Sequence, residues 1–306
     1  MECFEPVAAP RLAKKRFPDE SGSLAVIYPS RFKATVTNVI RALRAVSRRR
    51  YWSYELFSKL PEYIRAVEFC RRWIPVQHGE PAASPLNAST RANPLWSYFD
   101  SHKEGRVIFK WVHYFDIYER HFSKFAGRDV HVVEIGVLGG GSLEMWHHYF
   151  GPKCRVTGVD IDPRCKAYED GRTAIFIGNQ EDRQFWKSFR EQAPPVDILI
   201  DDGGHTPEQQ MVTLEEMLPY IRPGGVYLCE DVHGVSNRFA AYAHALADNI
   251  NTATAQTNKN PEFPLTSQTV DFQAAVSSVH FYPFVVVIEK TVVAVKEFAC
   301  RARGTQ

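Results

Sequence analysis

The sequence has 306 residues, of which 44% are hydrophobic and 24% are charged, a normal composition for a globular protein. This length allows one large domain or two ordinary ones with a sizeable core. The net charge of +2 argues neither for nor against nucleic acid, but residues 1–75 contain 15 Lys and Arg against 7 Asp and Glu, whereas residues 76–306 contain 22 against 28. The basic character therefore belongs to the N-terminal part, and we expect no nucleic-acid partner.

The six cysteines form no Cys-x-x-Cys pair, which argues against a zinc knuckle and against a framework of disulfides. The sequence has no run that approaches the roughly 18 apolar residues of a membrane helix. Its first twenty residues mix acidic and basic side chains, unlike a secretory signal. We therefore expect a soluble, cytoplasmic protein without a membrane span.

The N-terminal region is expected to hold a leader, two helices and a linker. Residues 1–30 are rich in proline and serine and predict a loosely ordered leader. Apolar residues recur at helical spacing from Thr35 to Trp73, and Pro61 is expected to divide this segment into two helices. Residues 74–95 contain four prolines and several small polar residues, which predicts a linker.

The domain boundary is predicted at this linker. Residues 1–95 would form the N-terminal leader and helical region, and residues 96–306 would form the domain that carries the chemistry. We expect the N-terminal helices to mediate self-association into a homo-oligomer or to cover the active site. The run Arg48-Arg49-Arg50 could contact RNA, phosphate or an acidic membrane surface, but a solvated helix face is the favoured interpretation.

A further segment with helical periodicity precedes the predicted sheet. From Arg106 to Phe125, aromatic and aliphatic residues recur with a helical period, which predicts one helix. This segment carries Lys110, His113 and Tyr114, which could approach a cofactor. An aromatic stripe at this spacing is, however, more often part of a core.

From residue 131 onward, short apolar segments alternate with helical ones. Strands are predicted at His131–Ile135, Arg155–Asp160, Ala174–Ile177, Asp197–Ile200 and Val226–Cys229. Helices are predicted at Ser142–Tyr149, Pro163–Glu169, Arg183–Gln192 and Thr206–Ile221. Because parallel neighbouring strands need crossover connections, this alternation predicts an α/β fold with a doubly wound, Rossmann-like sheet.

The C-terminal part is predicted to complete this sheet. A helix is expected over Ser236–Asn249, and the polar stretch that follows, up to Thr269, has the length of a lid or a binding loop. Two apolar segments, Val279–Tyr282 and Phe284–Glu289, flank Pro283 and predict a closing antiparallel hairpin at the sheet edge.

The turn after the first predicted strand is the first place to look for a ligand, because open α/β sheets bind ligands at the carboxyl ends of their strands. Its glycines, Gly136-x-x-Gly139-Gly140-Gly141, do not match the Gly-x-Gly-x-x-Gly spacing of dinucleotide sites. No lysine precedes Ser142, so the turn does not match a phosphate-binding P-loop either. A dinucleotide and a phosphate group bound by a P-loop are therefore both disfavoured as ligands of this turn.

Acidic and polar side chains are expected around this turn. Glu134 could meet a cationic amino group, and Asp160, at the end of the second strand, could accept hydrogen bonds from two ribose hydroxyls. S-adenosylmethionine meets these needs, and residues after the third strand would lie where its adenine edge is read. The predicted cofactor residues are Glu134, Gly136, Ser142, Asp160, Asn179, Gln180 and Asp182.

Five motifs occur in order at the predicted strand ends: Glu134-Ile135-Gly136, Gly158 to Pro163, Asp201-Asp202-Gly203-Gly204-His205, Arg222 to Gly225, and Glu230-Asp231. Together they resemble the class I S-adenosylmethionine-dependent methyltransferases. More narrowly, they are similar to the metal-dependent sugar O-methyltransferases of macrolide biosynthesis, of the macrocin and mycinamicin type, and to the related cephalosporin hydroxylase-like group. Lys110 to Tyr114 and His280 to Lys290 are similar to that group as well, so the resemblance covers about residues 105–290.

The two acidic clusters predict a metal site. Asp202 follows the fourth strand, and Glu230 and Asp231 follow the fifth, so their carboxylates would repel one another unless a cation lay between them. The resemblance implies that these three residues bind Mg²⁺ and that His205 is the general base. A bound metal can lower the pKa of an alcohol and hold it in line with a sulfonium methyl group.

Three neighbouring residues are less clearly assigned. Asp201 is expected either to contact the cofactor or to hold the loop, and it is counted with the cofactor site. His233 could contact the substrate but is equally typical of an ordinary loop histidine, so it is left out of the catalytic set. Gly204 stands where the resembled family usually has serine, a change that loosens the loop without removing a ligand.

The resemblance implies Mg²⁺-assisted transfer of a methyl group from S-adenosylmethionine to a hydroxyl of a sugar moiety or another natural product. The alternative is a binding or scaffold protein that keeps the fold and the cofactor pocket without turnover, although the three acids and His205 argue against it. A nicotinamide oxidoreductase has only the doubly wound sheet in its favour. Determinants of the acceptor are expected in the N-terminal helices and in residues 250–270.

Overall fold

The computed structural model describes residues 59–72, 93–234, 237–251, 266–300 and 303–304. The chain divides into two units, Met1–Glu80 and Pro81–Gln306, and each is described by itself. Four sequence predictions lie wholly or mostly outside the described residues: the leader, the first N-terminal helix, the linker, and the polar stretch after residue 251. No helix of the described ranges is both long and apolar enough to cross a membrane.

The first unit contributes one described helix, α3 (Leu60–Arg71). Pro61 was expected to separate two helices, and it lies in the first turn of α3. A proline is well accommodated there, because the first N–H groups of a helix have no partner within the helix.

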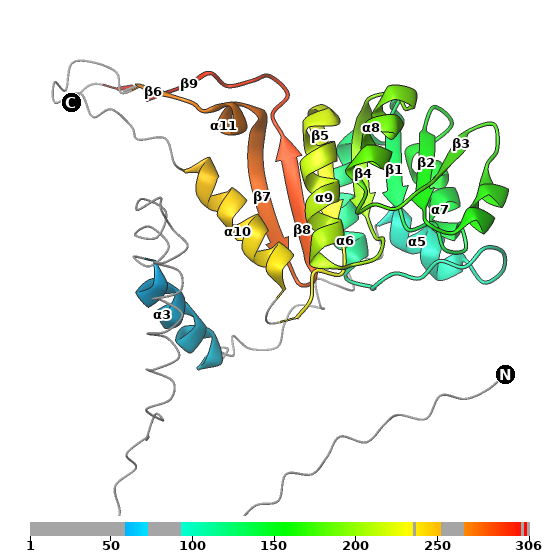
Figure 1. The fold of residues 1–306 in the computed structure, drawn as a ribbon, viewed down its shortest axis with the longest axis horizontal. Coiled ribbons are helices and arrows are strands. Elements are labelled where there is room, and N and C mark those ends of the chain that lie inside the picture. Colours follow the sequence, from blue (N-terminus) through cyan, green and yellow to red (C-terminus); the bar gives the residue numbers. More distant parts are fainter. Residues whose placement is uncertain (1–58, 73–92, 235–236, 252–265, 301–302, 305–306) are drawn as a thin grey trace, which may run out of the picture. The chain divides into compact units, whose positions relative to one another are not determined.

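The second unit is built around a seven-stranded sheet with the order β3-β2-β1-β4-β5-β8-β7 (Figure 1). Its strands are β1 (His131–Ile135), β2 (Arg155–Asp160), β3 (Thr173–Ile177), β4 (Val196–Asp201), β5 (Ile221–Cys229), β7 (Val276–Tyr282) and β8 (Val285–Lys290). The first five strands pair in parallel, whereas β8 is antiparallel to β5, and β7 to β8. This arrangement confirms the predicted Rossmann-like sheet and its closing hairpin.

Helices cover both faces of this sheet. They are α5 (Pro94–Ser101), α6 (Tyr114–Phe122), α7 (Gly141–Phe150), α8 (Arg183–Gln192), α9 (Pro207–Met217), α10 (Arg238–Ile250) and α11 (Asp271–Ala275). Ile198 and Ile200 of β4 belong to the core formed with α5, α6 and α7, whereas Leu199 between them belongs to the core formed with α8, α9 and α10. Strand side chains alternate between two buried faces, which explains why the strands read as continuous apolar runs.

The predicted helix from Arg106 to Phe125 is wrong in its first half. The helix α6 begins only at Tyr114, and residues 107–111 have no regular secondary structure. The cause lies in the glycine turn, since a Cβ at Gly141 would be 2.4 Å from the carbonyl oxygen of Arg106 and 2.5 Å from that of Val107. The backbone of this segment can therefore pass directly over the turn, and it does so without regular secondary structure.

Smaller differences concern helix ends and the predicted loops. The helix expected at Pro163–Glu169 is a 3₁₀ helix at Pro163–Tyr168, and the one expected to reach Ile221 gives way to a 3₁₀ turn after Met217. Pro94, assigned to the linker, begins α5. Within the predicted polar stretch, β6 (Thr266–Gln268) pairs with β9 (Glu297–Ala299) in a separate two-stranded antiparallel sheet.

A cluster of polar side chains joins α6 to the C-terminal hairpin. Glu289 of β8 lies 3.0 Å from Nδ1 of His121 and accepts a hydrogen bond from Lys124 across 3.2 Å. Nε2 of His121 lies 2.9 Å from the hydroxyl of Tyr282 on β7. These contacts lower the pKa of Glu289 to about 2, mainly through the hydrogen bond with His121.

Candidate active site

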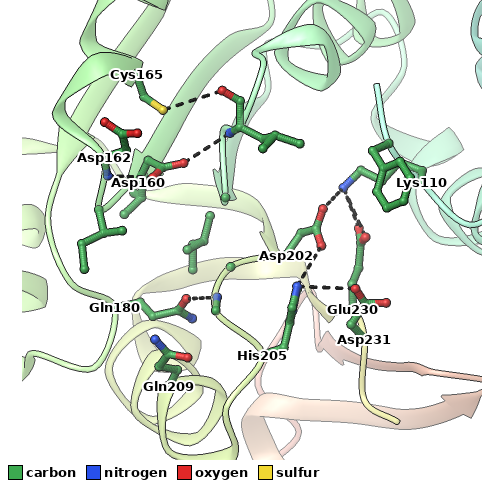
Figure 2. A pocket seen from close by; sticks show the side chains of 18 of the residues that line it. Lys110, Asp160, Asp162, Cys165, Gln180, Asp202, His205, Gln209, Glu230 and Asp231 are labelled. Carbon is green, nitrogen blue, oxygen red and sulfur yellow. Dashed lines mark hydrogen bonds and ion pairs between the residues drawn. The ribbon is translucent and has the colours of Figure 1, made fainter. Parts of the chain in front are cut away.

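A cavity of about 720 Å³ opens at the carboxyl ends of the parallel strands. Figure 2 shows acidic, amide and imidazole side chains that point into it from the loops after β2, β3, β4 and β5. Eight of the twelve predicted site residues line the cavity, namely Gly136, Asp160, Asn179, Gln180, Asp202, His205, Glu230 and Asp231. The other four, Glu134, Ser142, Asp182 and Asp201, are not part of its lining.

The glycine turn forms one wall of the cavity. Gly136 has a φ of +87°, and a Cβ at this position would be 2.0 Å from the carbonyl oxygen of Asp202. Asp160 accepts the backbone N–H groups of Val137 at 2.8 Å and of Leu138 at 3.3 Å. The carboxylate predicted for the ribose therefore also fixes the turn, and Gly136 is required by the chain's own backbone as much as by any ligand.

Gln180 connects the third strand's loop to the acidic loop after β4. Its Nε2 donates to Asp201 across 2.9 Å, and its Oε1 accepts the N–H of Gly204 at 2.8 Å. Asp201 also accepts a hydrogen bond from Tyr227 at 3.1 Å, and burial raises the pKa of this carboxyl to about 6. Of the two roles expected for Asp201, this geometry matches holding the loop.

Two further residues predicted at the cofactor have other partners. Asp182 is the N-cap of α8, where its side chain accepts the N–H of Gln184. Ser142 donates to Glu134 across 2.6 Å, and Glu134 itself is fully buried behind the cavity wall. Asp182 and Ser142 therefore make structural contacts next to the cavity and do not line it.

Lys110, which was expected only to be able to approach a cofactor and was not among the predicted site residues, lies inside the acidic cluster. Its Nζ lies 2.6 Å from Asp202, 3.1 Å from Glu134 and 3.2 Å from both carboxylate oxygens of Glu230. The Lys110 side chain is only 2% exposed. Burial alone would lower its pKa, but the surrounding carboxylates, Asp202 first among them, raise it well above the ordinary value, so Lys110 is charged.

His205 and Asp231 lie on the side of the acidic cluster away from Lys110, as Figure 2 shows. Nε2 of His205 lies 3.5 Å from Asp231 and 4.0 Å from Asp202. Both His205 and Asp231 have a positive φ, at +58° and +53°, a backbone conformation that side chains rarely adopt. Strain of this kind is typical of functional sites, where the surrounding structure holds it in place.

Aromatic side chains fix Asp231 at the mouth of the cavity. Oδ1 of Asp231 accepts hydrogen bonds from Tyr114 at 2.8 Å and from Trp111 at 3.1 Å. Phe284, at the turn of the hairpin, contacts the ring of Trp111 and that of His233. His233 thus lies at the mouth, beside the acidic cluster and outside the cavity lining.

The acidic cluster fits a divalent metal ion. Asp202, His205 and Asp231 each offer one ligand atom, and these atoms lie within 4.8 Å of one another. Carboxylate oxygens are the ligands that Mg²⁺ prefers. Glu230, the third predicted ligand, instead accepts hydrogen bonds from Tyr118 at 2.6 Å and from Lys110. In the described residues a second such group, His121, His280 and Glu289, lies in the polar cluster between α6 and the hairpin.

Comparison with known proteins identifies the central region. Residues 133–232, which include β1, the acidic loops and Asp231, match the model of a methyltransferase-domain family. This region is a methyltransferase domain. The matched region contains all twelve predicted site residues, including the three predicted metal ligands, whereas Lys110 lies before it.

Curated relatives of the chain are O-methyltransferases by name. One is 8-demethyl-8-(2-methoxy-alpha-L-rhamnosyl)-tetracenomycin-C 3'-O-methyltransferase of Streptomyces olivaceus, with 37% identity over 58% of this chain and 43% of the relative. Another is demethylmacrocin O-methyltransferase of Streptomyces fradiae, with 36% identity over 49% of this chain and 38% of the relative. The chain thus spans less than half the length of these two relatives.

A solved structure shares the fold of the methyltransferase domain. It is the MycE methyltransferase from the mycinamycin biosynthetic pathway, in complex with Mg and SAH. The similarity has a TM-score of 0.51 and 26% sequence identity, and it covers 65% of this chain and 54% of MycE. The chain therefore resembles the macrocin and mycinamicin type of enzyme, as the motifs indicated.

Proposed function

We propose that this chain is an S-adenosylmethionine-dependent O-methyltransferase that acts on a hydroxyl group of a sugar moiety in a natural product. The observation that carries the proposal is the convergence of Asp202, His205 and Asp231 on the cavity beside the glycine turn. The names of the relatives support both the reaction and the class of acceptor.

The cofactor would lie along the turn and the loops after β2 and β3. Asp160 projects into the cavity where two ribose hydroxyls could donate to it, although its oxygens already accept backbone N–H groups. Asn179 and Gln180 line the wall that would face the adenine. Glu134 would act indirectly, because its oxygens contact Lys110 and Ser142.

His205 is the proposed general base. Its Nε2 is directed towards Asp202 and Asp231, and its buried Nδ1 has no hydrogen-bond partner in the described part of the chain. An imidazole in this position can take the proton of an acceptor hydroxyl at neutral pH, while the neighbouring carboxylates stabilise the resulting charge.

Asp202 and Asp231 would hold Mg²⁺, the ion named in the MycE complex. The bound ion would supply a Lewis acid that lowers the pKa of the acceptor hydroxyl and orients it. Glu230, predicted as the third ligand, would complete the acidic wall of the cavity.

The proposal is tested by methyl transfer from labelled S-adenosylmethionine to a panel of rhamnosides and other glycosides, with Mg²⁺ present. We expect transfer by the full chain and a loss of at least about a hundredfold in His205→Ala, since general acid–base catalysis contributes about that much. His244→Ala, an exposed histidine of α10, is the matched control and should keep full activity. Undiminished transfer by His205→Ala would remove His205 as the base. Cofactor binding without transfer to any acceptor would favour the scaffold alternative.

A further inference from the structure

The buried ammonium group of Lys110 lies among carboxylates of three different elements. It contacts Glu134 of β1, Asp202 of the loop after β4, and Glu230 directly after β5. The side chains of Glu134 and Glu230 are at most 1% exposed, so water does not solvate either carboxylate. Unpaired buried charges are strongly unfavourable, and the positive charge of Lys110 reduces the repulsion among these carboxylates.

Glu230 is fully engaged in this arrangement. Both of its oxygens lie 3.2 Å from Nζ of Lys110, and Oε1 also accepts the hydroxyl hydrogen of Tyr118. A metal ion that took Glu230 as a ligand would have to displace the ammonium or share its oxygens. The carboxylate of Asp231, in contrast, accepts hydrogen bonds from the neutral donors Tyr114 and Trp111. It also lies 3.5 Å from the ring of His205 and 4.0 Å from that of His233.

Asp202 is shared between the two halves of the cluster. Its Oδ2 lies 2.6 Å from Lys110, whereas its Oδ1 faces His205 (Figure 2). A divalent ion held by Asp202 and Asp231 would therefore have a fixed positive charge on the other side of the same carboxylate. Two like charges this close repel each other strongly in a buried site.

We infer that Lys110 is a built-in counter-ion that competes with the divalent metal for the acidic cluster, lowers the affinity for that metal, and keeps Glu230 out of the ligand set. The inference rests on the proposed metal site, but not on the identity of the acceptor. The ammonium supplies one positive charge against the carboxylates of Glu134 and Glu230, so part of their charge is compensated before a metal arrives. A metal ion would then bind to the carboxylates that remain, those of Asp202 and Asp231.

The first experiment titrates chelator-treated full chain with MgCl₂ and with MnCl₂ by calorimetry. Lys110→Met removes the charge and keeps an unbranched apolar side chain, and we expect its metal affinity to rise at least about tenfold. Lys110→Arg keeps the charge and should stay within about threefold of the original affinity. Without metal, Lys110→Met should have a lower melting temperature than the original chain, and Mg²⁺ should raise it by more than in the original chain.

A second pair of variants separates competition from a purely structural role. Glu230→Gln should weaken metal binding by less than about threefold when Lys110 is present, and by at least about tenfold in the Lys110→Met background, where Glu230 is free to bind the ion. Asp231→Asn should weaken binding in both backgrounds. A structural role for Lys110 would not produce this dependence of one residue on the other.

The inference is overturned if Lys110→Met binds metal with equal or lower affinity. It is also overturned if Glu230→Gln in the original chain removes metal binding as completely as Asp231→Asn does. The second comparison decides the matter even if Lys110→Met does not fold. Because all these readouts are binding constants and melting temperatures, failure to find a methyl acceptor contradicts the proposed function and leaves the test of Lys110 intact.

Discussion

Asp160 accepts the backbone N–H of Val137 across 2.8 Å and so joins the end of β2 to the turn after β1. The same carboxylate accepts the N–H of Leu138 and, through its other oxygen, that of Asp162. A residue expected to bind the ribose is therefore also the clamp that shapes the cofactor turn, and its loss should affect stability and binding together.

Asp160→Ala should lower the affinity for S-adenosylmethionine at least about tenfold and reduce the free energy of unfolding by about 1–3 kcal/mol, because three backbone donors lose their acceptor. Calorimetry and urea denaturation measure the two effects. Asp170→Ala is the matched control, since Asp170 accepts the N–H groups of Arg172 and Thr173 at 2.8 Å and does not line the cavity. Equal loss of cofactor affinity in both variants would show that Asp160 acts only through general stability.

Gly136→Ala should be more destabilising than Gly151→Ala. Both glycines have a positive φ, +87° and +89°, so both variants lose stability through backbone strain, about 1–3 kcal/mol each. A Cβ at Gly151 meets nothing within 4 Å, whereas one at Gly136 would overlap the carbonyl oxygen of Asp202. We expect a further loss of at least about 2 kcal/mol in urea denaturation for Gly136→Ala. Identical unfolding free energies for the two variants would mean that the turn and the acidic loop separate easily.

Glu289 should make the domain sensitive to acid. Its pKa is lowered from the ordinary 4.5 to about 2 by the hydrogen bond with His121, so its stabilising contribution is present above about pH 4.5 and is lost as the pH falls towards 2. Glu289→Gln should therefore be less stable than the original chain by about 1 kcal/mol at pH 7, with the difference shrinking below pH 4.5. Urea denaturation between pH 7 and pH 3 measures this trend. Glu191→Gln, at an exposed position of α8, should show no such trend.

Much of the fold could be predicted because its signals are local. The strand β2 and the helix α8 have the predicted bounds, since an apolar run specifies the first and a helical period specifies the second. The irregular course of residues 107–111 could not be predicted in this way. Its apolar residues have a helical period, but its conformation depends on contact with a glycine turn more than thirty residues later in the chain.

The same difference between local signals and long-range contacts applies to the candidate site. The carboxylates at the strand ends could be predicted, because parallel strands bring their carboxyl ends to one edge of the sheet. Lys110 could not be assigned, since its partners Glu134, Asp202 and Glu230 are 24, 92 and 120 residues away. The sequence offered only the similarity of the segment Lys110 to Tyr114 to the resembled family and the suggestion that Lys110 could approach a cofactor. The predicted self-association through the N-terminal helices and the predicted domain boundary near residue 95 stay predictions.

The segment that crosses the glycine turn gives the domain an unusual dependence on its upstream sequence. The family match begins at residue 133, yet Lys110 and Trp111 reach into the cavity from before that point. A fragment that began at the first strand would keep every carboxylate of the acidic cluster and lose its buried cation. Substitutions in this short upstream segment could therefore change the net charge inside the cavity without any change in the strands of the sheet.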